Sequence, residues 1–341
     1  MFCCSGGQNI AGTLPTELAA LSFLQSISLP FNDFTGTLPV DYARMKHLQI
    51  LEVHGNNLEG SIPVEYWSAN ALQRFNVGEN MMTGTLSSEV GLLTNLTGLY
   101  VYKNMFTGSL PAEIGSLGNL CEFVRGATEN ITHSNVWTAY ARFNENGFVG
   151  TIPSELGELV QLHELWLQVN SFTGTVPTTL GSLKDSLCKS VRPSCRVRVP
   201  LTWVFSFTAD IRLGENRFSG TIPEEFYSLT LLWRADLQQN RFDGTFSTSI
   251  GQLTNMQIIR VSRNQLYPVQ LANIAGLRLA WLHLNLFTGS VPDQYCLNRG
   301  PGFLEFLSSD CGPPGVKATP CACCTSCCDR SSRVCVLQQL N

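Results

Sequence analysis

The sequence predicts an α/β solenoid, in which short parallel strands stack into one long sheet and the chain returns through helical turns on the outer side. Three observations predict this fold class: an asparagine that recurs at a constant interval, an alternating apolar pattern before each asparagine, and a glycine and a proline after it. A constant interval is typical of a solenoid, because each coil can bury its apolar face only against its neighbours.

The asparagine opens the pattern N-x-[LF]-x-G-[TS]-x-P, which recurs every 24 residues over most of the chain. With Gln8 in the first place, the series predicts about eleven repeats of 24 residues. The other members are Asn32, Asn56, Asn80, Asn104, Asn146, Asn170, Asn216, Asn240, Asn264 and Asn285. Three intervals differ from 24: two, of 42 and 46 residues, contain insertions, and the last has 21 residues.

A run of the form L-x-x-L-x-L-x-x-N ends at each asparagine, as in residues 48–56, 96–104 and 162–170. Apolar residues at alternate positions indicate a short strand with one buried face. The asparagine side chain carries both donors and acceptors, so it can satisfy the backbone of the turn that ends the strand. One coil buries only about five or six apolar side chains, so neighbouring coils must supply the rest of the stability.

The glycine and proline after each asparagine predict a turn at the edge of the sheet, because proline has no N–H to donate. The segments that follow, such as residues 112–120, predict helical or 3-10 turns on the outer side. A Thr/Ser column follows the glycine in ten repeats, from Thr13 to Ser290. Such a ladder could order water, as in ice-binding solenoids, but the hydroxyls belong to the repeat motif itself, and this alternative is not favoured.

The fuller motif N-x-[LF]-[TS]-G-[TS]-[LIV]-P, at residues 104–111 and 170–177 for example, resembles plant-type leucine-rich repeats. The resemblance covers residues 8–292. It implies a horseshoe whose concave parallel sheet binds a peptide, protein or small-molecule ligand, usually outside the cell, with a co-receptor as a further partner. The tail "CLNRGPGFLEFLSSDCG", followed by "PCACCTSCC", is similar to the C-terminal cap of leucine-rich repeat receptor-like surface proteins of diatoms and related algae.

Two parts are predicted: the solenoid over residues 1–295 and a cysteine-rich C-terminal cap and tail over residues 296–341. Eight of the thirteen cysteines fall in the second part. Thiolates at such spacing could hold a soft metal ion, but no histidine lies near them, and an extracellular chain favours disulfides. We expect Cys296 and Cys311 to pair and to close the core of the last coil.

Two insertions, at about 121–138 and 186–207, begin at the same point of the repeat, after the outer turn and before the next strand. Some plant receptors of this type carry an island between repeats that folds over the concave face, although those islands are longer. Translated introns or divergent loops are the favoured alternative, because introns in repeat genes often fall at one phase. In both cases we expect the sheet to continue from the Asn170 repeat to the Asn216 repeat.

The N-terminus lacks a basic region followed by an apolar stretch, so it does not resemble a signal peptide. Because the chain starts inside a repeat, we expect a truncated N-terminus, with a signal or anchor upstream. Two glycosylation sequons, at Asn95 and Asn130, are consistent with an extracellular or plasma-membrane surface location.

Composition excludes several classes of function. The net charge of -4 gives no positive field for nucleic acid or an anionic membrane surface. No uncharged apolar run reaches the roughly 18 residues that a membrane span needs. The five histidines are scattered over different repeats, with no partnered nucleophile and no metal-ligand spacing, so we expect no catalytic residue, metal or cofactor.

Side chains that alternate with the inward leucines should face the concave side. Most of the predicted ligand-binding residues lie four or two positions before an asparagine. The set is Tyr100, Tyr102, Lys103, Arg142, Asn144, Trp166, Gln168, Arg212, Asp236, Arg260 and Trp281. We expect its four aromatic side chains to be exposed, and aromatic residues with arginine are what binding hot spots favour. The alternative is a sheet whose exposed side chains form no ligand site.

The sequence therefore predicts a non-catalytic ligand-binding ectodomain of a receptor-like cell-surface protein. We place its site from Tyr100 to Arg212, with Trp166 as the anchor. Arg142 and Arg212 would be the charged partners of an acidic or carboxylate-bearing ligand. A secreted inhibitor of a foreign hydrolase and a structural or adhesive wall protein are the alternatives.

Overall fold

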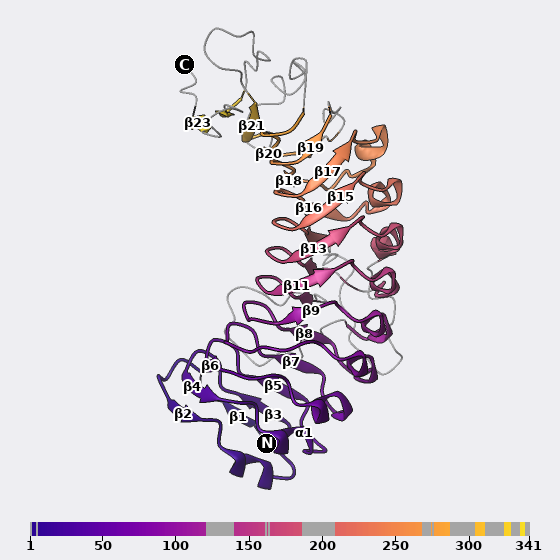
Figure 1. Cartoon of the computed structure of the whole chain (residues 1–341). Helices are drawn as coiled ribbons and strands as arrows, with labels where there is room; N and C mark the ends of the chain where they lie inside the picture. The colour runs from indigo at the N-terminus through magenta and orange to yellow at the C-terminus, as the bar shows by residue number, and fades with distance from the viewer. Residues whose placement is uncertain are drawn as a thin grey trace, which may run out of the picture.

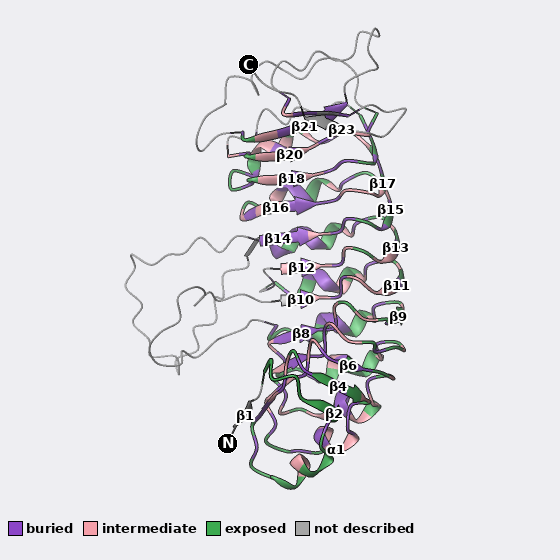
Figure 2. Ribbon diagram, turned by 90° about the vertical axis from the view of Figure 1, so that its left-hand side faces the viewer, coloured by how far each residue is buried: buried purple, intermediate pink, exposed green. Residues whose placement is uncertain are grey.

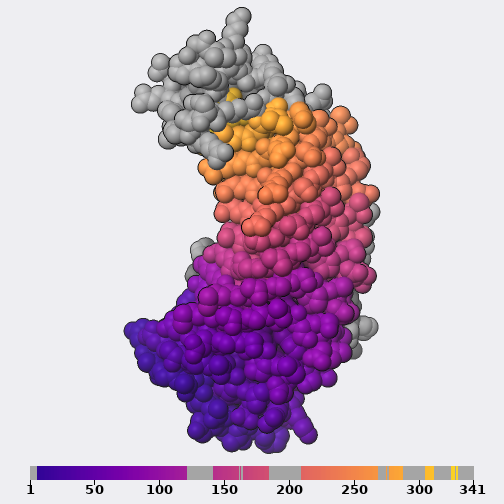
Figure 3. Space-filling view, in the orientation of Figure 1, coloured from indigo at the N-terminus to yellow at the C-terminus, as the bar shows by residue number. Residues whose placement is uncertain are grey.

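The computed structural model of the chain is a curved stack of coils (Figure 1). It describes residues 2–4, 6–120, 140–160, 162, 164–185, 209–267, 274, 276–286, 304–310, 324–328 and 335–337. The space-filling view shows that the stack is hollowed on one side, between its N-terminal and C-terminal coils (Figure 3). Figure 2 turns that hollowed side toward the viewer and shows that the main sheet lines it.

The main sheet has fourteen strands in the described part of the chain. In spatial order they are β1 (Phe2–Cys4), β3 (Ser26–Ser28), β5 (Ile50–Glu52), β7 (Arg74–Asn76), β8 (Gly98–Tyr100), β10 (Tyr140–Arg142), β12 (Glu164–Trp166), β14 (Ala209–Arg212), β16 (Leu232–Asp236), β18 (Ile258–Arg260), β20 (Leu279–Trp281), β21 (Phe306–Asp310), β22 (Ser326–Cys328) and β23 (Cys335–Leu337). Neighbours are parallel from β1 to β22, and only β22 and β23 pair antiparallel. The predicted fold class, a leucine-rich repeat solenoid with a parallel concave sheet, is confirmed.

The sheet continues across both insertions. β8 pairs with β10, with Gly98 opposite Tyr140, and β12 pairs with β14, with Glu164 opposite Asp210. The prediction of a continuous sheet between the Asn170 and Asn216 repeats is therefore confirmed. The insertions themselves, at about 121–138 and 186–207, lie outside the described residues.

A second set of short strands, which the sequence analysis missed, runs along the side of the solenoid between each asparagine and the glycine of its motif. Three form one sheet: β2 (Ala11–Thr13), β4 (Asp33–Gly36) and β6 (Asn57–Leu58). Six form another: β9 (Thr107–Gly108), β11 (Gly147–Gly150), β13 (Ser171–Gly174), β15 (Arg217–Gly220), β17 (Arg241–Gly244) and β19 (Gln265–Leu266). These strands form because adjacent coils also lie side by side here, so backbone N–H groups reach the carbonyls of the preceding coil.

The outer side consists mostly of 3-10 helices, as predicted. They are η1 (Thr16–Ala20), η2 (Val64–Ser68), η3 (Ser88–Leu92), η4 (Ala112–Ser116), η5 (Ser154–Glu158), η6 (Thr178–Asp185), η8 (Glu224–Ser228) and η9 (Thr248–Gln252), with the α-helical turn α1 (Val40–Ala43) among them. Most begin directly after the proline of the motif, which is extended, as Pro153 is with φ of -60° and ψ of 135°. The fixed φ of proline suits this entry into a helical turn.

The glycine and the Thr/Ser residue of the motif fit together between coils. Gly174 has a φ of 76°, a conformation that glycine adopts without steric cost. A Cβ atom on Gly174 would lie only 2.8 Å from Cγ2 of Thr151 in the preceding coil. The Thr methyl groups therefore have a packing role, which explains why the two residue types recur together.

The recurring asparagine joins each coil to the one before it. Asn170 Nδ2 donates to the carbonyls of Leu167, in its own coil, and Phe143, in the preceding coil, at 3.1 and 3.0 Å. Asn170 Oδ1 accepts from the N–H of Phe148 at 3.0 Å. The side chain thus satisfies turn backbone on both sides, as the sequence predicted.

A stack of phenylalanines runs through the core beside this asparagine ladder. Successive rings of the stack have centroids 6.1 to 6.4 Å apart and nearly parallel planes. The rings are those of Phe106, Phe148, Phe172, Phe218 and Phe242. All five side chains are fully buried. The [LF] position of the motif therefore forms a continuous column through the middle of the solenoid.

The described part of the predicted cap extends the main sheet through β21 and β22. Cys324 and Cys328 are disulfide-bonded, in agreement with an oxidised tail. The predicted partners Cys296 and Cys311, and the sequon at Asn130, lie outside the described residues. Asn95 is exposed, and its amide donates to the carbonyl of Asn70 at 2.8 Å. The division of the chain at residue 295 stays a prediction.

Membrane-spanning helices and metal-binding groups are both absent from the described residues. No helix in them is long and apolar enough to cross a membrane. They contain no group of three or more His, Cys, Asp or Glu side chains that could hold a metal ion.

Candidate functional site

Side chains project from the concave face in three columns, because successive strands pair in register. In the middle column, four residues before each asparagine, Arg142, Trp166 and Arg212 lie side by side on β10, β12 and β14. The sequence analysis identified this column and the one two residues before each asparagine. It missed the column six residues before each asparagine, to which Glu164 and Asp210 belong. Extending the two-residue alternation one step back along the strand would have found it.

The Trp166 side chain lies between two guanidinium groups. Cζ of Arg142 lies 3.9 Å from the centroid of the indole, and Cζ of Arg212 lies 3.7 Å from it. The two arginines come from the strands on either side of β12. Each such contact is worth about 0.5–1 kcal/mol at a partly exposed site. We call these three residues the Arg-Trp-Arg stack.

Both arginines of the stack already have carboxylate partners from the missed column. Arg142 Nη2 lies 2.9 Å from Glu164 Oε2, and Arg212 Nη2 lies 2.6 Å from Asp210 Oδ2. Arg212 Nε also donates to Asp210, whose side chain is buried. The expectation of two arginines available to an acidic ligand thus needs correction, because their charges are balanced within the sheet.

The same alternation of charge continues toward the C-terminus. Arg234 lies between Asp210 and Asp236, at 3.9 and 3.7 Å, and Arg260 lies 3.4 Å from Asp236. Burial raises the pKa of Asp236, against the opposing effect of the neighbouring arginines. Burial also raises the pKa of Glu164, with Arg142 opposing it. Ionised side chains are thus held in a partly desolvated lattice.

A second aromatic group follows in that direction. The guanidinium of Arg260 lies 4.5 Å from the Trp281 ring, and the centroids of Trp281 and Phe306 are 4.9 Å apart. Trp281 is half-buried like Trp166, so the structure places the predicted tryptophans in two separate clusters.

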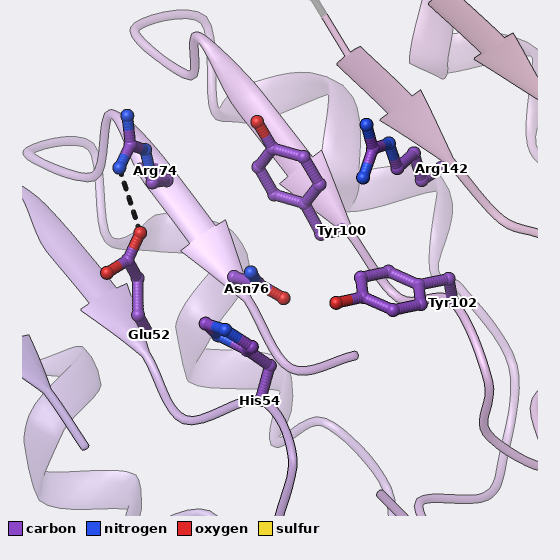
Figure 4. Close-up of a pocket in the computed structure, with 7 residues that line it drawn as sticks. All are labelled: Glu52, His54, Arg74, Asn76, Tyr100, Tyr102 and Arg142. Carbon is purple, nitrogen blue, oxygen red and sulfur yellow. Dashed lines mark hydrogen bonds and ion pairs between the residues drawn. The ribbon is translucent and has the colours of Figure 1, made fainter. Parts of the chain in front are cut away.

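A polar pocket of about 300 Å³ lies on the N-terminal side of the stack. Figure 4 shows its lining, which comes from β5, β7, β8 and β10 and from the turns that follow β5 and β8. The lining residues are Glu52, His54, Arg74, Asn76, Tyr100, Tyr102 and Arg142. Arg142 therefore belongs both to the pocket and to the Arg-Trp-Arg stack.

Two glycines shape this pocket, because the tyrosine rings lie where glycine leaves room. A Cβ atom on Gly98 would lie 2.7 Å from Cε2 of Tyr100, and one on Gly78 would overlap the Tyr102 ring. Tyr102 is half-buried, whereas only 7% of Tyr100 is exposed. The expectation that Tyr100 is exposed was wrong, because its ring lies down over a glycine of its own strand.

The acidic end of the pocket is held by hydrogen bonds. Glu52 Oε1 pairs with Arg74 Nη1 at 2.9 Å, and Glu52 Oε2 accepts from the Ser28 hydroxyl at 2.9 Å. Burial lowers the pKa of His54, which Glu52 and Glu79 only partly offset. This histidine is therefore neutral at neutral pH.

Three shielded polar atoms near the stack have no hydrogen-bond partner in the part of the chain that the structure describes: Asn144 Oδ1, Trp166 Nε1 and Gln168 Oε1. Shielded polar atoms without partners carry a desolvation cost, which a ligand can remove. Lys103, in contrast, lies in the turn after β8 and pairs with Glu79 at 3.8 Å. It does not line the pocket.

One serine–histidine contact was missed by the sequence analysis. Ser308 Oγ lies 2.7 Å from Nδ1 of His283, and the Asp310 carboxylate accepts from the N–H of Leu284 nearby. Only 1% of Ser308 is exposed, so its hydroxyl has no access to a substrate. The contact therefore fixes the last coils and does not provide a nucleophile.

No protein-family model matches the chain. Over 154 residues, 45% of this chain, it is 28% identical to Receptor-like protein 35 of Arabidopsis thaliana, of which it covers 16%. Over 157 residues, 46% of this chain, it is 26% identical to Receptor-like protein 32 of the same plant, of which it covers 18%. The chain spans less than a fifth of the length of these curated relatives.

Solved structures agree with this similarity. The crystal structure of a TDR receptor matches 83% of this chain and 43% of that chain, with a TM-score of 0.66 and 25% identity. The structure of the Arabidopsis receptor kinase HAESA, in complex with a peptide hormone and a co-receptor, matches 92% of this chain and 50% of that chain, with a TM-score of 0.64 and 25% identity. A plant ice-binding protein, 18% identical with a TM-score of 0.59, shares the fold alone. The chain thus has the leucine-rich repeat fold and is similar to receptor-like proteins and receptor structures of plants.

Proposed function

We propose that the chain is the non-catalytic ligand-binding ectodomain of a receptor-like protein at the cell surface, and that it binds a peptide on its concave face. The observation that carries this proposal is the Arg-Trp-Arg stack. A half-buried indole between two fixed guanidinium groups is an aromatic and arginine cluster of the kind that dominates binding energy at interfaces.

The pairing of each arginine with its own carboxylate favours binding through shape and hydrogen bonds. Glu164 and Asp210 hold the guanidinium planes against the indole before any ligand arrives, so little side-chain order is lost on binding. A carboxylate of the ligand would share Arg142 or Arg212 with these acids. The backbone amides of an extended peptide would satisfy Asn144 Oδ1 and Gln168 Oε1.

Similarity to HAESA, which is known in complex with a peptide hormone and a co-receptor, supports a peptide ligand and a co-receptor for this chain. It also supports a location at the plasma membrane or in the extracellular space. The similarity of the tail to caps of diatom and algal surface proteins remains part of this proposal, as does the site over Tyr100 to Arg212. No observation favours the hydrolase inhibitor or the wall protein.

The test is a selection from a random peptide library displayed on phage, carried out against the parent chain. Peptides enriched on the parent should lose about 2 kcal/mol or more of binding free energy, about 30-fold in Kd, on Trp166→Ala. Trp281→Ala, which removes the same side chain from the second aromatic cluster, is the matched control and should bind them as the parent does. Enriched peptides that bind Trp166→Ala undiminished would overturn this placement of the site.

A further inference from the structure

The pocket beside the stack has no net charge to offer a ligand. Its two arginines each face a carboxylate at 2.9 Å, Arg74 with Glu52 and Arg142 with Glu164. Burial lowers the pKa of the histidine in the lining, His54, so its ring is neutral. An anionic ligand would have to share an arginine with a carboxylate that already binds it and repels a second negative charge, whereas a neutral ligand would leave both ion pairs as they are.

The pocket nevertheless offers many donors and acceptors at close range. The Asn76 amide, the Glu52 carboxylate and the Tyr102 hydroxyl come together from three neighbouring coils (Figure 4). The Nδ1 atom of His54 is shielded from solvent and has no hydrogen-bond partner within the described ranges. A purely apolar ligand would leave the His54 Nδ1 atom unpaired, at a cost in affinity. A ligand rich in hydroxyl groups can pair with both donors and acceptors.

The half-buried Tyr102 ring adds aromatic surface to this polar rim, whereas only 7% of Tyr100 is exposed. The rings of Tyr100 and Tyr102 lie over Gly98 and Gly78, so they lie along the sheet instead of standing up into the pocket. The face of an aromatic ring is weakly negative, and polarised C–H groups pack well against it. A sugar ring presents C–H groups on its faces and hydroxyl groups around its edge, which matches a pocket with an aromatic side and a polar rim.

The size of the pocket agrees with one such ring. About 300 Å³ is the lower end of the range for small-molecule sites, and it equals the liquid volume of about ten water molecules. We propose that this pocket is a subsite for one neutral sugar ring, either in a free oligosaccharide or attached to a peptide. The proposal rests on the proposed function only in placing a ligand on the concave face, because the sugar does not need Trp166.

Gly78→Ala tests the subsite without removing any polar group. Gly78 is outside the left-handed region, so alanine fits its backbone, but the new methyl group would push the Tyr102 ring up into the pocket. Gly214 occupies the same place of its repeat, two residues before Asn216, and its Cβ would instead approach Asp236 Oδ1 at 2.8 Å. Gly214→Ala is therefore the matched control.

The probes are glucose, galactose and xylose as neutral sugars and galacturonic acid as a charged one, measured by saturation-transfer NMR on the full chain. We expect a neutral sugar to bind with a Kd of about 1 mM, at least tenfold weaker binding by Gly78→Ala, and unchanged binding by Gly214→Ala. Tyr102→Ala should also weaken binding, and it serves if Gly78→Ala does not fold. Binding of galacturonic acid alone, binding of no sugar, or unchanged binding by a folded Gly78→Ala would each overturn the proposal.

The sugar probes contain no peptide, so their binding is measured independently of the peptide selection, and the failure of one proposal can be told from the failure of the other. A neutral oligosaccharide and a synthetic peptide carrying one hexose distinguish the two sources of the ring. Tighter binding of the glycopeptide than of the free sugar would show that the subsite recognises a glycosylated peptide. Tighter binding of the oligosaccharide would assign it to a free glycan.

Discussion

The core of the solenoid and its concave face are built from the same repeat but differ in how strictly each position is kept. Asn216 donates to the carbonyl of Leu167 at 2.9 Å and accepts from the N–H of Phe172 at 3.0 Å, across a 46-residue interval. It thereby repeats the contacts of Asn170. On the concave face, by contrast, the middle column changes in kind at almost every step, from a hydroxyl through carboxylate, ring and guanidinium groups.

This difference shows where stability and recognition reside. Each core contact serves two coils, so its loss breaks the joint between them. Each concave side chain contacts mainly its lateral neighbours and the solvent, so it can vary while the coil stays intact. Core substitutions should therefore lower the free energy of unfolding most and leave specificity unchanged, whereas face substitutions should change specificity at a smaller cost in stability.

The largest expected effect is that of Phe172→Ala. The Phe172 ring lies 6.1 Å from both Phe148 and Phe218 and is fully buried, so its loss leaves a cavity in the middle of the stack. We expect the free energy of unfolding to fall by about 3–5 kcal/mol, measured by urea denaturation. Leu92→Ala, at an exposed position of η3, is the control. A loss below about 1 kcal/mol would show that the stack is not essential to the core.

Asn216→Ala should have the next largest effect. Its amide is buried, and its removal leaves the N–H of Phe172 and the carbonyls of Leu167 and Leu213 without their partner. We expect a loss of about 3 kcal/mol, because each buried group left unpaired costs about 1–3 kcal/mol. Asn255, whose amide donates only to the Thr230 carbonyl on the outer side, is the matched control. Equal losses for the two alanine variants would contradict the special role of the ladder.

Both of these core features could be predicted from the sequence, since the asparagine and the [LF] residue recur at a fixed interval. The continuity of the sheet over the second insertion was predictable for the same reason. The packing of the concave face was not, because it depends on contacts among variable side chains, within a strand and between strands, that no repeat pattern encodes. Tyr100 is buried because Gly98 leaves it room, and Arg212 is paired because Asp210 precedes it by two residues on the same strand.

A smaller effect is expected for Arg212→Lys, which keeps the charge but removes the planar group. Arg212 donates through Nε and Nη2 to Asp210 and covers the Trp166 ring, and an ammonium group cannot do both. We expect a loss of about 1 kcal/mol in stability, the size of one cation–π contact. Arg241→Lys, on the exposed side strand β17, is the control. If both variants unfold at the same urea concentration, the stack is not held by the geometry of the guanidinium.

The smallest expected effect concerns the pH dependence that Glu164 gives to the face. Because burial raises the pKa of Glu164, the folded chain holds the proton more tightly than the unfolded chain does. The stability contributed by this group is then complete below the unfolded pKa of about 4.3, and it is lost as the pH rises through the higher folded value. Glutamine stays neutral, so Glu164→Gln should gain stability relative to the parent as the pH rises from 4 to 7.

We expect this relative gain to raise the melting temperature by roughly 2 °C between the two ends of that range. Glu158→Gln, an exposed carboxylate on the outer side, should show no such trend. If the difference in melting temperature between Glu164→Gln and the parent stays constant with pH, or reverses its trend, then the ion pair with Arg142 outweighs the effect of burial on Glu164. The lattice of charges on the concave face would in that case stabilise the coils as the core does, and the division between core and face would not hold at β12.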